Sequence, residues 1–187
     1  VLDLSHSGHQ TATDALNHLD KRGLDVSVMA SHGGINERYS GKKTDKNNGR
    51  NLKLEHLNRI AEMGGLVGIY ALTFGLADTD NSSTVFYEQL REASQRWPNS
   101  VMVGSDAVYK NVDNETRRQH YEKFMVPLIA MGTDMEPRFP DLIPAFNTES
   151  IMPSIESELL RIGVARQQVD AVIGGNFVRF FSEVLPD

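Results

Sequence analysis

Short apolar runs alternate along the chain with stretches that carry apolar residues at helical spacing. Four runs are short, apolar and followed by polar or turn-forming residues, which is typical of buried strands in a parallel sheet. They lie at residues 1–5 (VLDLS), 25–30 (DVSVMA), 66–72 (LVGIYAL) and 100–106 (SVMVGSD). The helical pattern predicts helices at residues 11–21, 52–63, 82–96, 114–131, 149–163 and 165–185, the last one broken near Gly174-Gly175.

Three positions carry specific boundary signals. Gly23 follows the first predicted helix and suits the left-handed conformation at a helix end. Asn51 precedes the second predicted helix and is expected to cap its N-terminus. The GGN segment at 174–176 lacks the Lys-Ser/Thr of a phosphate-binding loop and follows no strand, so we interpret it as a junction between helices.

The alternation of strands and helices predicts an α/β fold with parallel strands joined by helical crossovers. An open doubly wound sheet and a (β/α)8 barrel both satisfy this pattern. Residues 1–187 show no linker or repeat, so one domain is expected. Because the chain has four predicted strands and a barrel needs eight, the barrel interpretation makes this chain half of a barrel.

Composition narrows the classes of protein. The chain has 187 residues, 40% hydrophobic and 24% charged, as in ordinary globular domains. Its net charge is −6, and its one short basic segment is interrupted by Asp45, which argues against nucleic-acid binding. No apolar run of about 18 residues predicts a membrane span. Cysteine is absent, so any bound metal must be held by His, Asp or Glu.

Three chemically versatile side chains lie at or just past the carboxyl ends of predicted strands: His6, His32 and Asp106. The carboxyl ends of parallel strands share one face of an α/β fold, and active sites lie there. Neutral imidazole is a good zinc ligand, and a carboxylate can complete the site or transfer protons. The sequence therefore predicts a zinc site at this edge. A structural role for each histidine, as a hydrogen-bonded residue at a strand end, remains the alternative.

Other polar residues are weaker candidates. His9 is close to His6 in the chain and is a second candidate ligand, whereas His56 and His120 are expected to face solvent. Arg50 ends a glycine-rich loop. Its guanidinium either lies in solvent or binds a substrate carboxylate.

Several segments together resemble the renal (membrane) dipeptidase family. In family order they are DLSH at 3–6, ASH at 30–32, GRNL at 49–52, AEMGGLVGI at 61–69, VGSD at 103–106 and ELLRIGVARQQVDAVIGGNFVRFF at 158–181. The resemblance implies a (β/α)8 TIM-like barrel with two zinc ions. This chain would supply its C-terminal half, strands five to eight, with the N-terminal half missing.

The resemblance also implies roles for individual residues. His6 and His32 match histidines that hold one zinc, and Asp106 matches an aspartate that binds the substrate amino group and manages protons. Arg50 matches the arginine that binds the free carboxylate of the substrate. The implied activity is that of a metallopeptidase, a hydrolase that cleaves dipeptides in proteolysis through a metal-bound hydroxide.

Departures from the family pattern leave alternatives open. The family's N-terminal His-x-Asp pair and bridging glutamate have no counterpart, so residues 1–187 alone are expected to be inactive. Ala107-Val108-Tyr109 stands where the family has Phe-Asp-Gly, and Tyr109 is expected to form a wall of the substrate pocket. The alternatives are a family member with a tailoring or binding role, or another barrel-fold amidohydrolase. A homodimer and the compartment, cytoplasm or periplasm, are left open.

Overall fold

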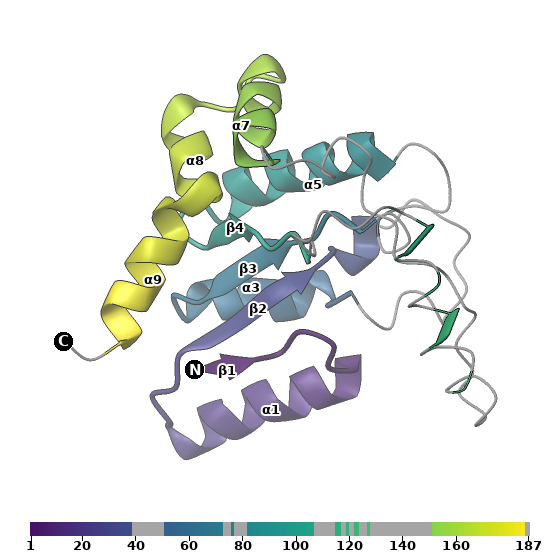
Figure 1. Cartoon of the computed structure of the whole chain (residues 1–187). Coiled ribbons are helices and arrows are strands. Elements are labelled where there is room, and N and C mark those ends of the chain that lie inside the picture. Colours follow the sequence, from purple (N-terminus) through teal and green to yellow (C-terminus); the bar gives the residue numbers. More distant parts are fainter. Residues whose placement is uncertain are drawn as a thin grey trace.

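The computed structural model describes residues 1–38, 51–72, 76, 82–106, 115, 116, 119, 122, 123, 127 and 151–185. Within these residues, the centre of the molecule is a parallel sheet with the strand order β1-β2-β3-β4 (Figure 1). The predicted strands are confirmed. Their bounds are Leu2–Asp3 for β1, Val28–Gly33 for β2, Leu66–Ile69 for β3 and Val101–Val103 for β4.

Helices connect successive strands and then complete the chain. Helix α1 follows β1, α3 precedes β3, and α5 precedes β4 (Figure 1). Helices α7, α8 and α9 follow, with a π-type turn, η3, between the last two. The bounds are His9–Arg22 for α1, Asn36–Arg38 for the short η1, Leu54–Glu62 for α3, Ser82–Arg96 for α5, Ile151–Arg161 for α7, Arg166–Asp170 for α8, Ala171–Gly175 for η3 and Asn176–Val184 for α9.

The end of helix α1 agrees with the sequence. Gly23 has φ 57° and ψ 39°, the left-handed conformation expected after the end of α1. Of the helix predicted for 114–131, the structure describes residues 115, 116, 119, 122, 123 and 127, and these are helical. No helix in the described part of the chain is long and apolar enough to cross a membrane.

The order of the strands bears on the choice between a doubly wound sheet and a barrel. Each strand pairs in parallel with the next one along the chain. A doubly wound sheet reverses its strand order at a switch point, whereas a barrel adds strands in chain order. The observed order therefore favours the barrel interpretation of this α/β fold.

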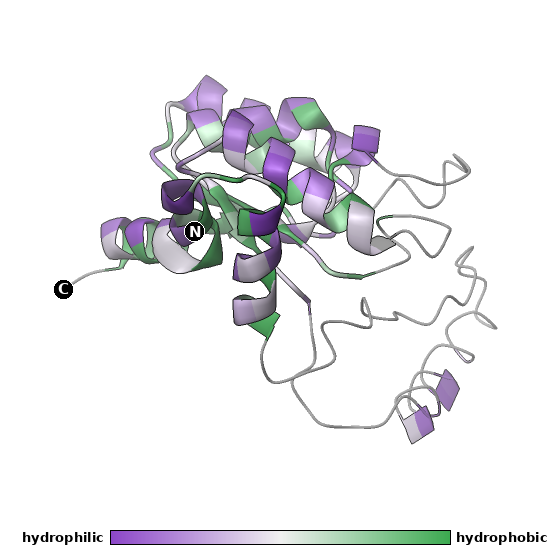
Figure 2. Cartoon of the chain, turned by 90° about the horizontal axis from the view of Figure 1, so that it is seen from above, coloured by the Kyte–Doolittle hydropathy of each residue, from purple (hydrophilic) through white to green (hydrophobic). Residues whose placement is uncertain are grey.

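The two faces of the sheet have different partners. Alternate strand residues, such as Val28, Val67 and Val101, belong to a large core with the buried residues of the crossover helices. Hydrophobic residues gather where these helices meet the sheet (Figure 2). Leu66 and Met102 belong instead to a second cluster with residues of α9. Helix α9 therefore covers the opposite face near the amino ends of β3 and β4.

The N-cap predicted for the second helix is wrong. Lys53, and not Asn51, is the residue before the first turn of α3, and it makes no side-chain capping bond. Asn51 is fully buried, and its Oδ1 accepts hydrogen bonds from the Gly34 N–H at 3.1 Å and the Tyr70 hydroxyl at 2.6 Å. The Gly34 N–H and the Tyr70 hydroxyl are buried donors that need an acceptor, and the Asn51 side chain supplies it.

His56 was expected to face solvent and is instead 1% exposed. It lies on α3 at the contact with α1, where its Nε2 is 2.8 Å from the Thr13 hydroxyl. The contact between the two helices buries this position, which the sequence pattern alone had assigned to the solvent side. His120 lies outside the described residues.

The C-terminal junction is confirmed as a break between helices. Gly174 interrupts the helical conformation between α8 and α9. Directly after it, the buried Asn176 side chain donates hydrogen bonds to the carbonyl oxygens of Pro98, at 3.0 Å, and Val101, at 2.8 Å. Arg179 donates to the carbonyls of Gly64 and Asn99. The GGNFxR segment thus attaches α9 to the amino ends of β3 and β4.

Candidate functional site at the carboxyl ends of the strands

The ends of β1 and β2 bring His6 and His32 together. The two Nε2 atoms are 2.7 Å apart, and the ring centroids are 4.6 Å apart at an interplanar angle of 65°. The residues are 26 positions apart in the chain and meet because β1 and β2 are parallel neighbours. The predicted convergence of the two rings is confirmed.

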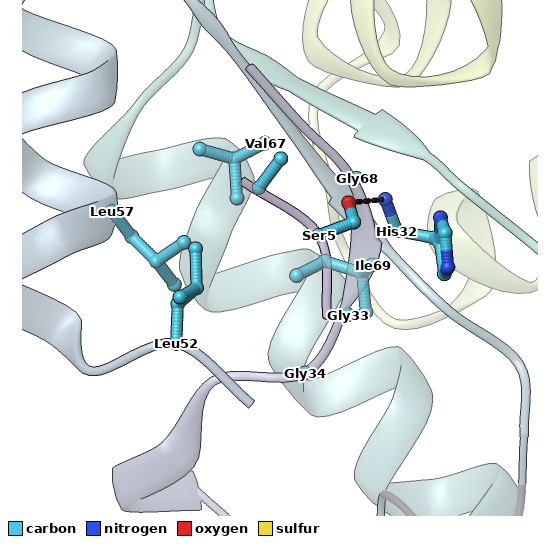
Figure 3. A pocket seen from close by; sticks show the side chains of 10 residues that line it. Ser5, His32, Gly33, Gly34, Leu52, Leu57, Val67, Gly68 and Ile69 are labelled. Carbon is cyan, nitrogen blue, oxygen red and sulfur yellow. Dashed lines mark hydrogen bonds between the residues drawn. The ribbon is translucent and has the colours of Figure 1, made fainter. Parts of the chain in front are cut away.

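A β-bulge brings His32 to this position. Ala30 pairs with Val67 and Gly33 with Ile69, so that three steps along β2 correspond to two along β3. Strict alternation would place the side chains of Ser31 and His32 on opposite faces of the sheet. An extra residue in the strand allows both side chains to lie on one face. Figure 3 shows the His32 ring directed away from the apolar side chains of Leu52, Leu57 and Val67, which belong to the core.

Two glycines allow the bulged segment to lie close to its neighbours. A Cβ at Gly68 would lie 2.0 Å from the Ser31 carbonyl oxygen, and one at Gly104 would lie 2.1 Å from the same atom. A side chain at either position would therefore displace the backbone of β2 at the histidine. These glycines are not among the predicted site residues, although a glycine within an apolar strand is a signal for such a close approach.

The backbone is unusual at two of the predicted site residues. His6 has φ 61° and Asp106 has φ 52°, the left-handed conformation that residues other than glycine rarely adopt. Both side chains are exposed and lie a few residues beyond the carboxyl ends of their strands. Such conformations cluster at functional sites, where surrounding contacts hold the chain in place.

A polar network lies behind His32. The Asp3 Oδ1 accepts the backbone N–H of Ser5 at 2.9 Å and of Ser31 at 3.1 Å. The Ser5 and Ser31 hydroxyls are 3.0 Å apart, and the Ser31 Oγ is 2.9 Å from the His32 Nδ1. The His32 N–H donates to the Ser5 Oγ at 3.1 Å (Figure 3).

Asp3 is ionised more readily than an ordinary aspartate. Burial raises the pKa of its carboxyl, but hydrogen bonds from the side chains and backbone of Ser31 and Ser5 lower it and prevail, so the net pKa lies below the usual value. Asp3 and Ser31 are not among the predicted site residues, although both stand within the matched DLSH and ASH segments.

The other predicted site residues are not brought into this pair. In the described ranges, no group of three His, Asp or Glu side chains is close enough to hold a metal, so Asp106 does not complete such a group with the histidines. Arg50 and Tyr109 lie outside the described residues, and their roles stay predictions. The second candidate ligand, His9, instead has its Nε2 2.8 Å from the Asn51 carbonyl oxygen.

The two histidines fit zinc as part of a ligand set. The His32 Nδ1 faces Ser31, which leaves Nε2 directed toward His6. Two nitrogen ligands of a tetrahedral zinc lie about 3.3 Å apart, because each Zn–N bond is about 2.0–2.1 Å. The 2.7 Å separation of the two Nε2 atoms would have to widen by about 0.6 Å to reach that spacing. Further ligands would have to come from residues outside the pair.

The described residues form an α/β fold with a four-stranded parallel sheet, which is consistent with part of a barrel. Among solved structures, the chain is similar to an amidohydrolase from Pseudomonas aeruginosa, with a TM-score of 0.65 and 21% sequence identity. The similarity covers 97% of this chain and 51% of that protein, so the chain spans about half its length. At this identity the likeness shows the fold alone. No protein-family profile and no curated protein matches the chain.

Proposed function

We propose that the chain is part of a metal-dependent hydrolase of the amidohydrolase type, in which His6 and His32 are zinc ligands. The observation that carries this proposal is the 2.7 Å approach of their Nε2 atoms. The fold supports it, because the pair lies at the carboxyl ends of parallel strands, where active sites of barrels occur. The likeness to the bacterial amidohydrolase supports a hydrolase.

In its finer form, the proposal is a dipeptidase-like enzyme that cleaves dipeptides or related small amides. The matched DLSH, ASH and VGSD segments support it. Arg50 would bind the substrate carboxylate, and Asp106 would bind the amino group and manage protons. Zinc, two ions in the resemblance, would supply positive charge that stabilises a developing oxyanion and would acidify bound water.

Zinc content and activity test this proposal. His6→Ala and His32→Ala, made in the full-length protein, should each remove one zinc equivalent, measured by elemental analysis, and most of the dipeptide hydrolysis. His18→Ala is the matched control, because His18 is exposed on α1. Unchanged zinc content in both site variants would contradict the metal assignment.

A second candidate is a family member with a tailoring or binding role in place of peptidase activity. The observation that favours it is the replacement of Phe-Asp-Gly after VGSD by Ala107-Val108-Tyr109. A panel of dipeptides and small amides separates the two candidates. Zinc binding without hydrolysis of any panel member would support the second, and hydrolysis would support the first.

A further inference from the structure

Asn51 joins the two chain segments that carry the candidate zinc ligands. His9 begins α1 three residues after His6, and its Nε2 is 2.8 Å from the Asn51 carbonyl oxygen. Gly34 follows His32 by two residues, and its N–H donates to the Asn51 Oδ1 at 3.1 Å. One residue therefore binds the segment after β1 through its backbone and the segment after β2 through its side chain.

The groups themselves fix the direction of these hydrogen bonds. A carbonyl oxygen can only accept, so the His9 ring donates from Nε2. A backbone N–H can only donate, so the oxygen of the Asn51 side chain, and not its NH2 group, faces Gly34. The Tyr70 hydroxyl donates to the same oxygen at 2.6 Å. These contacts therefore allow one arrangement of protons.

Burial and a short strand-like pairing hold Asn51 in place. Asn51 is 0% exposed and Tyr70 is 3% exposed, so water cannot readily replace their hydrogen bond. The next residue, Leu52, pairs in parallel with Ile35, and its carbonyl oxygen accepts the Asn36 N–H at 3.1 Å. Asn51 is thus fixed relative to the carboxyl ends of β2 and β3.

Pairing of the strands does not by itself hold the two histidines together. The ladder between β1 and β2 ends before either histidine. Ser5 bridges the two strands on the near side of the pair, where its Oγ accepts the His32 backbone N–H at 3.1 Å. Beyond His6 and His32 along both segments, Asn51 supplies a second bridge.

We propose that Asn51 and His9 are positioning residues that hold the His6 and His32 rings against each other, so that both Nε2 atoms face one point. This inference rests on the proposed function, since the benefit of a fixed spacing is to present two nitrogens to one metal ion. Residues behind metal ligands orient them at metal sites in general. His9, the second candidate ligand in the sequence, then acts through the Asn51 carbonyl and not on the metal.

The contact between the rings is measured first, without metal, by NMR of the full-length protein with protonated histidine in a deuterated background. Ring centroids 4.6 Å apart should give a nuclear Overhauser effect between the His6 and His32 ring protons. We expect this signal to be lost in Asn51→Ala. It should remain in Asn176→Ala, the matched control, because Asn176 is also a buried, hydrogen-bonded asparagine but lies at the opposite end of the sheet.

Zinc affinity, measured by chelator competition, tests the consequence for the metal. It should fall about 10-fold in Asn51→Ala and in His9→Ala, and stay at the wild-type value in Asn176→Ala. His9→Gln is the conservative variant, because its side-chain NH2 can donate to the Asn51 carbonyl as the imidazole does, and it should retain the affinity. An equal loss in His9→Gln and His9→Ala would contradict the positioning role of His9.

The readouts separate this inference from the proposed function. A ring-to-ring signal of wild-type strength in a folded Asn51→Ala would overturn the inference, whatever the zinc content. A signal that depends on Asn51, in a protein that binds no zinc, would overturn the proposed function and leave the positioning role standing. If Asn51→Ala does not fold, His9→Ala tests the same bridge, because it removes one donor at a half-buried position and leaves Asn51 in place. An unchanged signal in His9→Ala would then overturn the inference.

Discussion

At the scale of single residues, His56 shows how burial controls a titratable group. Its Nε2 is hydrogen-bonded to Thr13, while its Nδ1 is buried without a hydrogen-bond partner. Burial is the largest cause that lowers the pKa of His56, and the positive charges of neighbouring groups add to it. Glu55 opposes the shift without reversing it. Folding therefore favours the neutral form of this ring.

A pH dependence of stability follows. Because the folded-state pKa lies below the ordinary 6.5, the unfolded chain takes up a proton first as the pH falls. The free energy of unfolding therefore decreases as the pH falls below about 6.5, and this decrease stops once the pH is below the folded-state pKa of His56. His56→Gln should reduce the loss between pH 7.5 and pH 5, measured by urea unfolding, whereas His18→Gln should not. Parallel pH profiles for wild type and His56→Gln would contradict this prediction.

Tyr109 carries a second prediction at this scale, from the sequence alone. It replaces a glycine of the family motif and is expected to narrow the substrate pocket. Tyr109→Gly should therefore widen the range of dipeptides that the full-length protein accepts, measured as kcat/KM over a panel. Identical kinetics across the panel would show that Tyr109 points away from the substrate.

At the scale of elements, the contact between the bulge of β2 and its neighbours is held by glycine. Gly68→Ala and Gly104→Ala would each place a methyl group about 2 Å from the Ser31 carbonyl oxygen, a backbone atom that cannot rotate away. Each should destabilise the protein by about 1–3 kcal/mol and lower zinc affinity by shifting His32. The matched control is Gly8→Ala, because a Cβ there meets nothing within 4 Å. Wild-type unfolding and zinc affinity in both site variants would contradict the role of these glycines.

Helix α9 and the site occupy opposite ends of the sheet. The Asn176 amide satisfies two carbonyl groups at the start of β4, and the side chain is 4% exposed. Asn176→Ala should cost about 1–3 kcal/mol of stability, because it leaves both acceptors without this donor. Zinc affinity should not change, since the two histidines lie at the carboxyl ends of β1 and β2, away from Asn176. The control is Gln10→Ala, because Gln10 is exposed on α1. Loss of zinc from Asn176→Ala without loss of stability would contradict the structural role assigned to Asn176.

At the scale of the whole molecule, the sheet has two open edges as far as the structure describes it. Within the described residues, β1 pairs with β2 alone and β4 with β3 alone, so each outer strand has backbone groups without a strand partner on one side. The similar amidohydrolase is about twice as long as this chain. A closed barrel would pair both edges and bring further ligands to the two histidines.

We therefore predict that residues 1–187, expressed by themselves, bind less than one zinc per chain and hydrolyse no dipeptide. Two imidazoles are fewer than the three or four protein ligands that zinc usually has. Addition of a polypeptide that supplies the other barrel strands should restore zinc binding and sharpen thermal unfolding. A monomer that unfolds cooperatively and cleaves dipeptides without that addition would contradict the half-barrel interpretation.

The sequence by itself determined the elements and the meeting of the two histidines. Strand and helix periodicities are local, so β1 to β4, α5 and the break at Gly174 could be predicted from neighbouring residues. The convergence of His6 and His32 followed from one further rule, that parallel strands end at the same edge.

Only the tertiary structure decided how the site is built. The bulge depends on the register of β2 against β3, and the burial of His56 and Asn51 depends on elements that pack against them. The Asp3 carboxylate reaches Ser31 because two strands 28 positions apart in the chain lie side by side. These features come from contacts between distant residues, which local patterns of hydrophobic and polar positions do not encode.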